Sequence, residues 1–489
     1  MVSLPYGVTR FHLIVLVVWQ LTMFLSIQMI FGIFSNYVPQ WRCLDNNDNS
    51  TSRAFSKDCL VFNSNCTIEY ENNYFYSAAV HFKWVCSDLA YLTSVQSQVQ
   101  FVGVLLGTVI FGFLSDLVGR KPISLFTVTL GVSTTIYCGI TQDMWHFVFC
   151  RFFVGLAVGG ALNSTCTFVM ELLLPKQRMA LRAFFNWGVA RFMLTVICYY
   201  FNDYKSASIV CGVIALPIVF IILFIIPESP TYLHNKGKID LMIRSEKKIA
   251  QISGVPFIPK ENAPIIKKET ICSVLSNRDL IKKLVVLWIM WFCSSLCGYG
   301  MDLHSNEISG NLFINQLFFS ITIWASKPIL PILDNKFDWF TRRFLHQSSQ
   351  GTVIICFAVL SILVGCHYNG ILILLINVIG IIFIEYTWDA CYLCVIELMP
   401  TNVRSSAMGS CSMMARCGAI LAPMLPFMNA VWPGGAYATV AVVGSINLVV
   451  SYLYLSESKN VILDHVHLKT EEDQKEDVTT SFIKDERQY

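Results

Sequence analysis

The sequence predicts an all-α membrane protein of twelve transmembrane helices, built as two repeats of six helices each. Two observations lead to this fold class. Hydrophobic residues make up 55% of the 489 residues and charged residues only 14%, against about 25% charged residues in soluble domains. A pattern of acid, proline and arginine after one apolar stretch also returns later in the chain, with Glu171, Arg178 and Arg191 recurring as Glu397, Arg404 and Arg416. A duplicated half of about six spans is typical of transporters whose substrate site lies between the halves.

Twelve apolar stretches are each close to the roughly 20 residues that cross the hydrocarbon of a bilayer. We expect the first six spans at residues 10–37, 97–118, 121–141, 145–173, 181–201 and 205–226, and the second six at 282–301, 309–333, 351–368, 370–398, 404–428 and 434–456. The first stretch is too long for a signal peptide and lacks a small-residue cleavage site, so we expect it to be retained. An even number of spans places both termini on one side.

Basic residues are distributed unevenly between the loops, and this predicts the orientation. Eleven Lys or Arg residues lie between Thr231 and Lys283, but only four lie between Asn36 and Thr93. Because basic loops stay in the cytoplasm, we expect both termini to be cytoplasmic. The expected organisation is an N-terminal half over 1–226, a cytoplasmic linker over 227–281, a C-terminal half over 282–456 and a charged, disordered cytoplasmic tail over 457–489.

The first loop, about residues 38–95, has the features of an extracellular segment. It contains two Asn-X-Ser/Thr acceptors for glycosylation, Asn49 and Asn65, and four candidate disulfide cysteines, Cys43, Cys59, Cys66 and Cys86. Glycans and disulfides both form on the lumenal or extracellular side. The other fourteen cysteines are scattered without metal-ligand spacing and are expected to be small buried hydrophobic residues.

The short loop after the second span reads GFLSDLVGRK, from Gly112 to Lys121. Its glycines permit a tight turn, Asp116 can cap a helix or pair with a cation across the halves, and Arg120 with Lys121 can anchor to the inner leaflet. This loop resembles the signature loop of the major facilitator superfamily. The corresponding loop of the second half, Asp334–Arg343, keeps an acid and two arginines but has no glycine. We leave open whether that second loop is a gating element or a plain basic turn.

Several further motifs resemble those of the organic-ion transporters among the solute carriers, which move organic anions, cations and carnitine. The motifs are Pro227-Glu228-Ser229-Pro230, Trp291-Phe292 with Tyr299-Gly300, Glu397 to Arg404, and Ala415-Arg416-Cys417-Gly418 with Pro423, in a match that runs from about Arg10 to Asn460. The resemblance implies the major facilitator fold. It also implies a cytoplasmic gate formed by Asp116, Arg120, Glu171, Arg178, Glu228, Glu397 and Arg404. The first loop departs from the family, with about half the usual length and four cysteines where relatives often have six.

Charged residues within the predicted spans are candidates for the substrate site, because each costs about 2.5 to 3.5 kcal/mol at mid-membrane on insertion scales. Glu385 and Asp389 share one face of the tenth span with Trp388 and Tyr392. These acids either bind substrate or neutralise Lys327 and Arg416. The predicted substrate site comprises Arg191, Tyr299, Lys327, Glu385, Trp388, Asp389, Tyr392 and Arg416.

The resemblance implies that Lys327 and Arg416 face the cavity, as in anion-transporting relatives; in cation-transporting relatives the position of Arg416 holds an acid. Three cations against two acids favour an organic anion or a zwitterion. Glu385 is unusual for the anion type and leaves a cation, a carnitine-like zwitterion or a proton step open. The aromatic residues would give an amphiphilic ligand apolar contact.

The sequence contains no phosphate loop, metal cluster or nucleophile elbow, so we expect no enzyme activity, cofactor, metal or nucleic-acid partner. Transport would then be secondary, driven by a gradient or by exchange, and located in the plasma membrane. The expected partners are a small organic ion, a counter-substrate or coupling ion, and the lipid bilayer, with the oligomeric state left open. A receptor-like protein that kept the fold without transport is the competing function.

Overall fold

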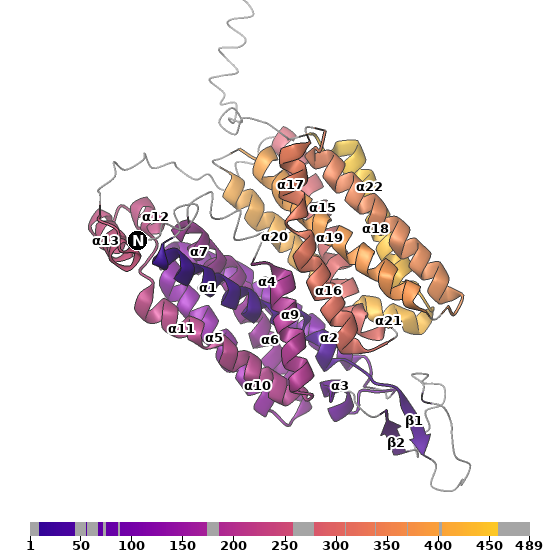
Figure 1. Ribbon diagram of the computed structural model, residues 1–489. Helices are drawn as coiled ribbons and strands as arrows, with labels where there is room; N and C mark the ends of the chain where they lie inside the picture. The colour runs from indigo at the N-terminus through magenta and orange to yellow at the C-terminus, as the bar shows by residue number, and fades with distance from the viewer. Residues whose placement is uncertain are drawn as a thin grey trace, which may run out of the picture.

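The computed structural model describes residues 9–44, 55, 67–71, 75–86, 89–173, 185–257, 278–308, 310–337, 339–368, 370–400 and 403–457. Two helical bundles lie side by side, one from each half of the chain (Figure 1). Within the described residues, eleven helical segments are long and apolar enough to cross a membrane. The predicted fifth span appears as a shorter helix, α9, and with it the architecture agrees with twelve spans.

Within the part of the chain that the structure describes, the first bundle contains six helical segments. The first segment joins α1 (Arg10–Ser26), η2 (Ile27–Ile30) and α2 (Gly32–Ser35). The next are α4 (Leu92–Leu117), α5 (Arg120–Ile140), and α6 (Met144–Gly160) continued by η4 (Ala161–Thr165) and α7 (Cys166–Leu172). The last are α9 (Trp187–Tyr200), and α10 (Tyr204–Ala215) continued by α11 (Pro217–Phe220) and η5 (Ile221–Ile225).

Counted over the described residues, the second bundle also contains six segments. They begin with α15 (Arg278–His304), extended by η6 (Ser305–Glu307), and α16 (Leu312–Ser326), continued by α17 (Ile329–Lys336). The next two are α18 (Arg342–Gly365) and α19 (Ile371–Leu398). The chain then forms α20 (Arg404–Leu421) with α21 (Met424–Val431), and α22 (Gly435–Tyr454).

The two ends of the bundles differ in the elements they carry (Figure 1). One end has the antiparallel hairpin of β1 (Trp41–Leu44) and β2 (Thr67–Tyr70) with the short helix α3 (Ala78–His81). We call it the hairpin face. The opposite end has α12 (Pro230–Asn235) and α13 (Ile239–Ser253) from the lysine-rich linker, and we call it the basic face.

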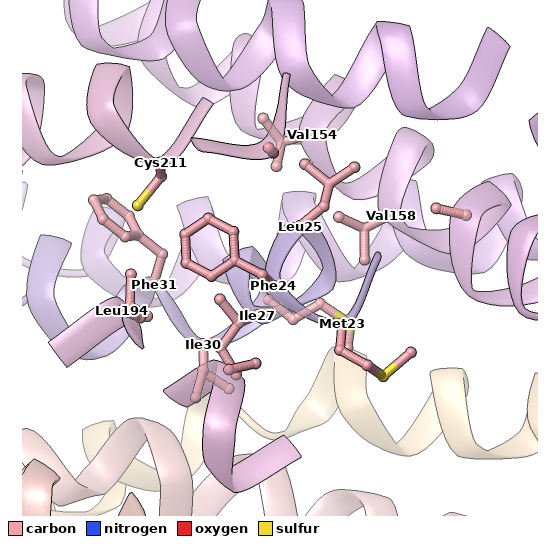
Figure 2. Close-up of a cluster of buried hydrophobic side chains, with 14 of the residues drawn as sticks. Met23, Phe24, Leu25, Ile27, Ile30, Phe31, Val154, Val158, Leu194 and Cys211 are labelled. Carbon is pink, nitrogen blue, oxygen red and sulfur yellow. The ribbon is translucent and has the colours of Figure 1, made fainter. Parts of the chain in front are cut away.

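The core of the first bundle is apolar and closely packed (Figure 2), with Phe24, Phe31 and Val154 fully or almost fully buried. Helices α4 and α6 approach so closely that glycine is required. A Cβ atom added to Gly107 or Gly155 would lie 2.0 Å from a backbone oxygen of the facing helix. Small residues permit such close contact between membrane helices, whose packing cannot depend on the exclusion of water.

The ninth span begins earlier than the sequence analysis predicted. Helix α18 starts at Arg342 and not near residue 351. Its first turns, at the basic face, contain polar residues. Gln350 is buried and its Oε1 accepts a hydrogen bond of 3.0 Å from Nδ2 of Asn447 in α22. His346 and Ser349 are also buried. Hydropathy undervalued this segment because its polar residues face another helix and not lipid.

The described part of the first loop contains two of the four candidate disulfide cysteines. Cys86 is disulfide-bonded in the structure, and Cys43 lies in β1. Cys59 and Cys66 and both glycosylation candidates, Asn49 and Asn65, lie outside the described residues. The full set of disulfides and the glycans stay predictions.

If the loop is extracellular and both acceptors are used, glycosidase treatment of the protein made in animal cells should increase its mobility on a denaturing gel. Changing Asn49 and Asn65 together to Gln should abolish that shift. Asn163 forms a matched control, because it has the acceptor pattern but lies in a membrane-spanning helix. A wild-type protein whose mobility does not respond to glycosidase would contradict the predicted orientation.

Candidate substrate site between the two halves

Among the described residues, the two halves meet mainly where α9 packs on α16 and α4 on α20, and α15 also contacts η2 and α2. The first of these contacts is so close that a Cβ atom on Gly188 of α9 would lie 2.7 Å from the backbone nitrogen of Trp324 in α16. Most of the predicted substrate residues come from α9, α15, α19 and α20, so they lie in the helices that form this interface or beside them.

An aromatic cluster joins the halves near the hairpin face. The ring of Phe313, in α16, lies 6.2 Å from Phe34, 6.4 Å from Phe75 and 5.5 Å from Tyr199, measured between centroids. Phe313 belongs to the second half and the other three to the first half. Phe313 is only 9% exposed, so the cluster is packed between the halves at this end.

A buried ion pair also joins the halves. Arg191 in α9 is 1% exposed, and its Nη1 lies 2.5 Å from Oδ1 of Asp302 in α15. Its Nε and Nη2 donate to Oε1 of Gln316 in α16, at 3.2 and 2.7 Å. Asp302 was not among the predicted site residues. It lies near the end of an apolar span. It could have been found by asking which acid neutralises Arg191.

Arg416, the counterpart of Arg191 in the repeat, has a different environment. Its Nη1 lies 3.3 Å from the hydroxyl of Tyr299 in α15 and 3.8 Å from the sulfur of Met29 in the other half. Among the described residues no carboxylate lies within ion-pairing distance of Arg416, and its buried Nε has no hydrogen-bond partner. The ring of Phe101, also from the other half, lies 5.1 Å from that of Tyr299.

Lys327 is neutralised by both acids of the tenth span. Its Nζ lies 2.8 Å from Oε2 of Glu385 and 2.8 Å from Oδ2 of Asp389. The expected pairing of these acids with a cation is therefore present for Lys327 but not for Arg416. With all three groups ionised, the triad has a formal charge of −1. Glu385 is also close enough to Asp302 to interact with it electrostatically.

The aromatic residues of the predicted site separate into two places. Tyr299 contacts Arg416, as described above. Trp388 and Tyr392 pack with Trp291, at 5.6 and 4.5 Å between ring centroids, in the contact between α15 and α19. Trp291 is almost completely buried, whereas Trp388 and Tyr392 are partly buried. Trp388 lies between Glu385 and Asp389 in the sequence of α19.

One further charged residue inside the first bundle was missed. Arg151 in α6 is 1% exposed, and its Nη2 donates to the backbone oxygen of Gln28 at 2.9 Å and to Oε1 of Gln100 at 2.7 Å. These neutral partners come from the same half. Its place within one bundle indicates a structural role.

At the basic face, the first half has its own charged cluster. Nη2 of Arg120 lies 2.6 Å from Oδ1 of Asp116, and its Nε lies 3.4 Å from Oε1 of Glu171. Glu171 also accepts a hydrogen bond of 2.5 Å from the hydroxyl of Ser229. The carboxylate of Glu228 accepts from the backbone nitrogen of Lys121 at the start of α5. Burial raises the pKa of Glu228, although hydrogen bonds from the backbone nitrogens of Ser229, Lys121 and Arg120 oppose the rise.

The second half repeats this arrangement with Glu397, which the sequence analysis assigned to the gate, and with Asp334 and Arg342 of the loop whose gating role it left open. Arg342 forms two hydrogen bonds with Asp334, at 2.8 and 3.1 Å, and its Nε lies 2.9 Å from Oε1 of Glu397. Glu457 accepts from the backbone nitrogen of Arg342 at the start of α18, as Glu228 does at α5. The loop from Asp334 to Arg343 therefore keeps the signature arrangement without its glycines. The repeat itself was the signal that could have identified Arg342.

Gly119 shows what the first signature loop requires. Its φ is +140°, and a Cβ atom there would lie 2.6 Å from a carboxylate oxygen of Glu228. Glycine is therefore needed for both backbone conformation and space.

The two other gate candidates are Arg404, which has no ion pair among the described residues, and Arg178. Among the described residues Arg404 donates only to the backbone oxygen of Met399, at 3.3 Å. Arg178 lies outside the described residues. At the basic face, every ion pair between two described residues joins residues of the same half. A gate that closes this face by pairs across the halves stays a prediction.

If the N-terminal cluster controls closure of the basic face, Asp116→Asn should slow transport several-fold without lowering the amount of folded protein. Asp116 is 64% exposed, and exposed ion pairs contribute only about 0 to 1 kcal/mol to stability. Maximal uptake rate divided by surface amount is the measurement. Asp240→Asn, which removes an exposed acid of α13, is the matched control. A normal maximal rate in Asp116→Asn would refute a role in gating.

Comparison with known proteins gives the family. The model of the sugar (and other) transporter family matches residues 22–469. An uncharacterised protein of Caenorhabditis elegans is 32% identical, over 96% of this chain and 97% of its own. Solute carrier family 22 member 15-like of Xenopus tropicalis is 26% identical, over 90% and 89%. Organic cation/carnitine transporter 4 of Arabidopsis thaliana is 25% identical, over 88% and 82%.

Solved structures confirm the fold. The xylose transporter XylE of E. coli, in an inward-open conformation, superposes with a TM-score of 0.65 at 14% identity, over 93% of this chain and all of that one. The expected major facilitator fold and the resemblance to organic-ion transporters are thereby confirmed. The chain is a multi-pass membrane protein and not an enzyme, and it belongs to the sugar (and other) transporter family of the major facilitator superfamily, with organic-ion transporters among its relatives.

Proposed function

We propose that this protein is a secondary transporter of small amphiphilic organic ions in the plasma membrane, and that Arg416 binds the anionic group of the substrate. The observation that carries the proposal is the environment of Arg416, a cation at the interface of the halves with a buried, unpartnered Nε and no carboxylate within ion-pairing distance among the described residues. A guanidinium in that position favours a carboxylate or sulfate, which it can bind through two parallel hydrogen bonds.

The comparison with Arg191 strengthens this assignment. The two arginines occupy equivalent positions of the repeat, but Arg191 is held by Asp302 and Gln316. An arginine that already has a carboxylate and an amide partner has little capacity left for a ligand. Arg191 therefore fits a role in joining the halves better than the predicted role in substrate binding.

A specific observation favours a zwitterion as the substrate. Lys327 faces two acids, so that triad has one carboxylate in excess. The same helix, α19, carries the partly buried Trp388. A cationic group such as a quaternary ammonium is attracted by both a carboxylate and an aromatic face. With Arg416 for the anionic end, the interface offers groups for both charges of a carnitine-like molecule. Inclusion of Asp302 also makes the count three cations and three acids, which weakens the case for a purely anionic substrate.

The proposed transport cycle is alternating access, in which the halves open at one face at a time. The aromatic cluster around Phe313 and the Arg191–Asp302 pair hold the halves together near the hairpin face. At the basic face, the clusters around Arg120 and Arg342 are each satisfied within one half. These contacts support a state that is closed at the hairpin face. A receptor-like protein without transport is the alternative.

Uptake into oocytes separates these possibilities. The panel would contain a labelled aromatic carboxylate, a quaternary ammonium ion without a carboxylate, and carnitine, with water-injected oocytes as the control. The proposal predicts uptake of carnitine or of the carboxylate, and no uptake of the plain ammonium ion. Uptake of the ammonium ion alone would refute Arg416 as the anion-binding group. Surface protein without uptake of any of the three would favour the receptor-like alternative.

A further inference from the structure

Two lysines meet at the end of the sixth span, on the basic face. Nζ of Lys121, in the first turn of α5, donates to the backbone oxygen of Leu223 at 3.1 Å. Nζ of Lys248, in α13, donates to the backbone oxygen of the next residue, Phe224, at 3.3 Å. The last carbonyl groups of a helix lack partners within the helix, and the two ammonium groups bind adjacent ones. The two lysines are close enough to repel each other.

The surroundings of this pair are apolar on the lipid side. Phe224 is 67% exposed, and Phe220 and Leu223 are also exposed, as expected of residues that face hydrocarbon. Leu241 of α13 is exposed as well. It lies on the same helical stripe as Lys248, because residues 241, 244 and 248 are three or four positions apart. That stripe also contains Arg244, which is exposed.

The nearby acids cancel only part of this charge. Glu228 interacts electrostatically with Lys121, but its carboxylate accepts from the backbone nitrogens of Lys121 and Ser229. Glu246 lies about 160° from Lys248 around α13, but Asp240 precedes Arg244 by four residues and lies on the same stripe. Three basic side chains, Lys121, Lys248 and Arg244, therefore stand against two acids, Glu228 and Asp240, which leaves an excess of positive charge. We call the three basic side chains the lysine pair and its arginine.

We propose that the lysine pair and its arginine form a binding site for the headgroup of an anionic phospholipid in the leaflet at the basic face. Each ammonium group has three donors, of which one is bound to a carbonyl, so both lysines can donate further to one phosphate. The exposed rings of Phe220 and Phe224 would contact the acyl chains of the same lipid. Basic side chains near an anionic leaflet favour binding of anionic lipid, so Lys121, Lys248 and Arg244 would each contribute to the affinity.

A lipid bound at this site would connect α5 and α13. Lys121 begins α5, next to the signature loop, and Lys248 belongs to the linker helix α13. A phosphate between them would relieve their repulsion and fix α13 against the first half. The inference concerns lipid binding and does not depend on which substrate is transported.

The test uses the purified full chain in nanodiscs that contain phosphatidylcholine with phosphatidylserine, with retained lipid measured by native mass spectrometry after mild detergent release. The wild type should retain phosphatidylserine in preference to phosphatidylcholine. The double variant Lys121→Gln/Lys248→Gln should lose that preference at least several-fold. The matched control is Lys205→Gln/Lys236→Gln, which removes two lysines outside the site and should keep it. Size-exclusion profiles show whether each variant is folded.

Two results would overturn the proposal. Equal retention of phosphatidylserine by the wild type and by the folded Lys121→Gln/Lys248→Gln variant would show that the lysine pair does not select the lipid. Displacement of the retained lipid by millimolar inorganic phosphate would show that a free anion, and not a phospholipid at the membrane surface, is the ligand. If the double variant does not fold, Arg244→Gln provides the second variant, and unchanged retention in it would also count against the site.

Discussion

Arg416→Asp should abolish uptake of any substrate that depends on a carboxylate or sulfate, with at least a hundredfold loss in maximal uptake rate over KM. The substitution removes the guanidinium beside Tyr299 and places a negative charge where the anionic group of the substrate would bind. The carboxylate of the new Asp side chain and the anionic group of the substrate would repel each other strongly in a site of low dielectric constant. It also introduces the residue type expected in cation-transporting relatives. The measurement is uptake of the labelled carboxylate and of carnitine, normalised to the protein at the surface.

Controls at the same position separate charge from geometry. Arg416→Lys keeps the positive charge but loses the planar arrangement of donors, so we expect a partial loss, mainly in KM. Arg416→Gln removes the charge and keeps a donor. If Arg416→Asp takes up carboxylates as fast as the wild type, Arg416 does not bind the anionic group. Gain of uptake for a plain quaternary ammonium ion in Arg416→Asp would support the assignment further.

The triad around Lys327 should respond differently. Glu385→Gln leaves Lys327 paired with Asp389 at 2.8 Å, so the fold should persist while the excess negative charge is lost. For a zwitterionic substrate we expect about a tenfold rise in KM for carnitine and little change for a plain carboxylate. A Glu385→Gln variant with unchanged kinetics for carnitine would contradict a role of the triad in binding its cationic end.

The sequence predicted the fold well because lipid leaves few alternatives. Apolar stretches of about 20 residues in a chain with an internal repeat identify membrane helices almost regardless of how the helices pack. The prediction was least accurate at α18, where buried Gln350 and Ser349 lower the hydropathy of a helix that is nevertheless continuous.

The pairing of charges within the site could not be predicted as well. Sequence identified Lys327, Glu385, Asp389, Arg191 and Arg416 as charges in spans, but it could not show which cation each acid contacts. Partners come from helices far apart in the chain, as with α16 and α19 for the triad. The acid that pairs with Arg191 was missed because it lies near the end of its span, where an acid is less unusual. The repeat relates positions in the two halves but does not fix their neighbours.

A buried charge is costly unless it is paired, and the pair of Arg191 with Asp302 therefore has a large expected effect. Removal of one partner of a buried ion pair typically costs about 3 to 5 kcal/mol, because the other charge stays buried and unpaired. Here the partners belong to different halves. The loss should therefore weaken closure of the hairpin face as well as stability. Gln316 alone, a neutral residue with one oxygen on the guanidinium, cannot neutralise it.

Asp302→Ala should lower the midpoint of thermal unfolding and reduce the maximal uptake rate at least tenfold, because the unpaired Arg191 favours states in which water reaches the interface. Arg191→Ala should have a similar effect, since it leaves Asp302 buried. In the double variant Arg191→Ala/Asp302→Ala no charge is left unpaired, so its unfolding midpoint should lie above that of either single variant. This non-additivity is the signature of a direct interaction. Losses in unfolding midpoint that simply add in the double variant would show that the two residues act independently, and the pair would then not hold the halves together.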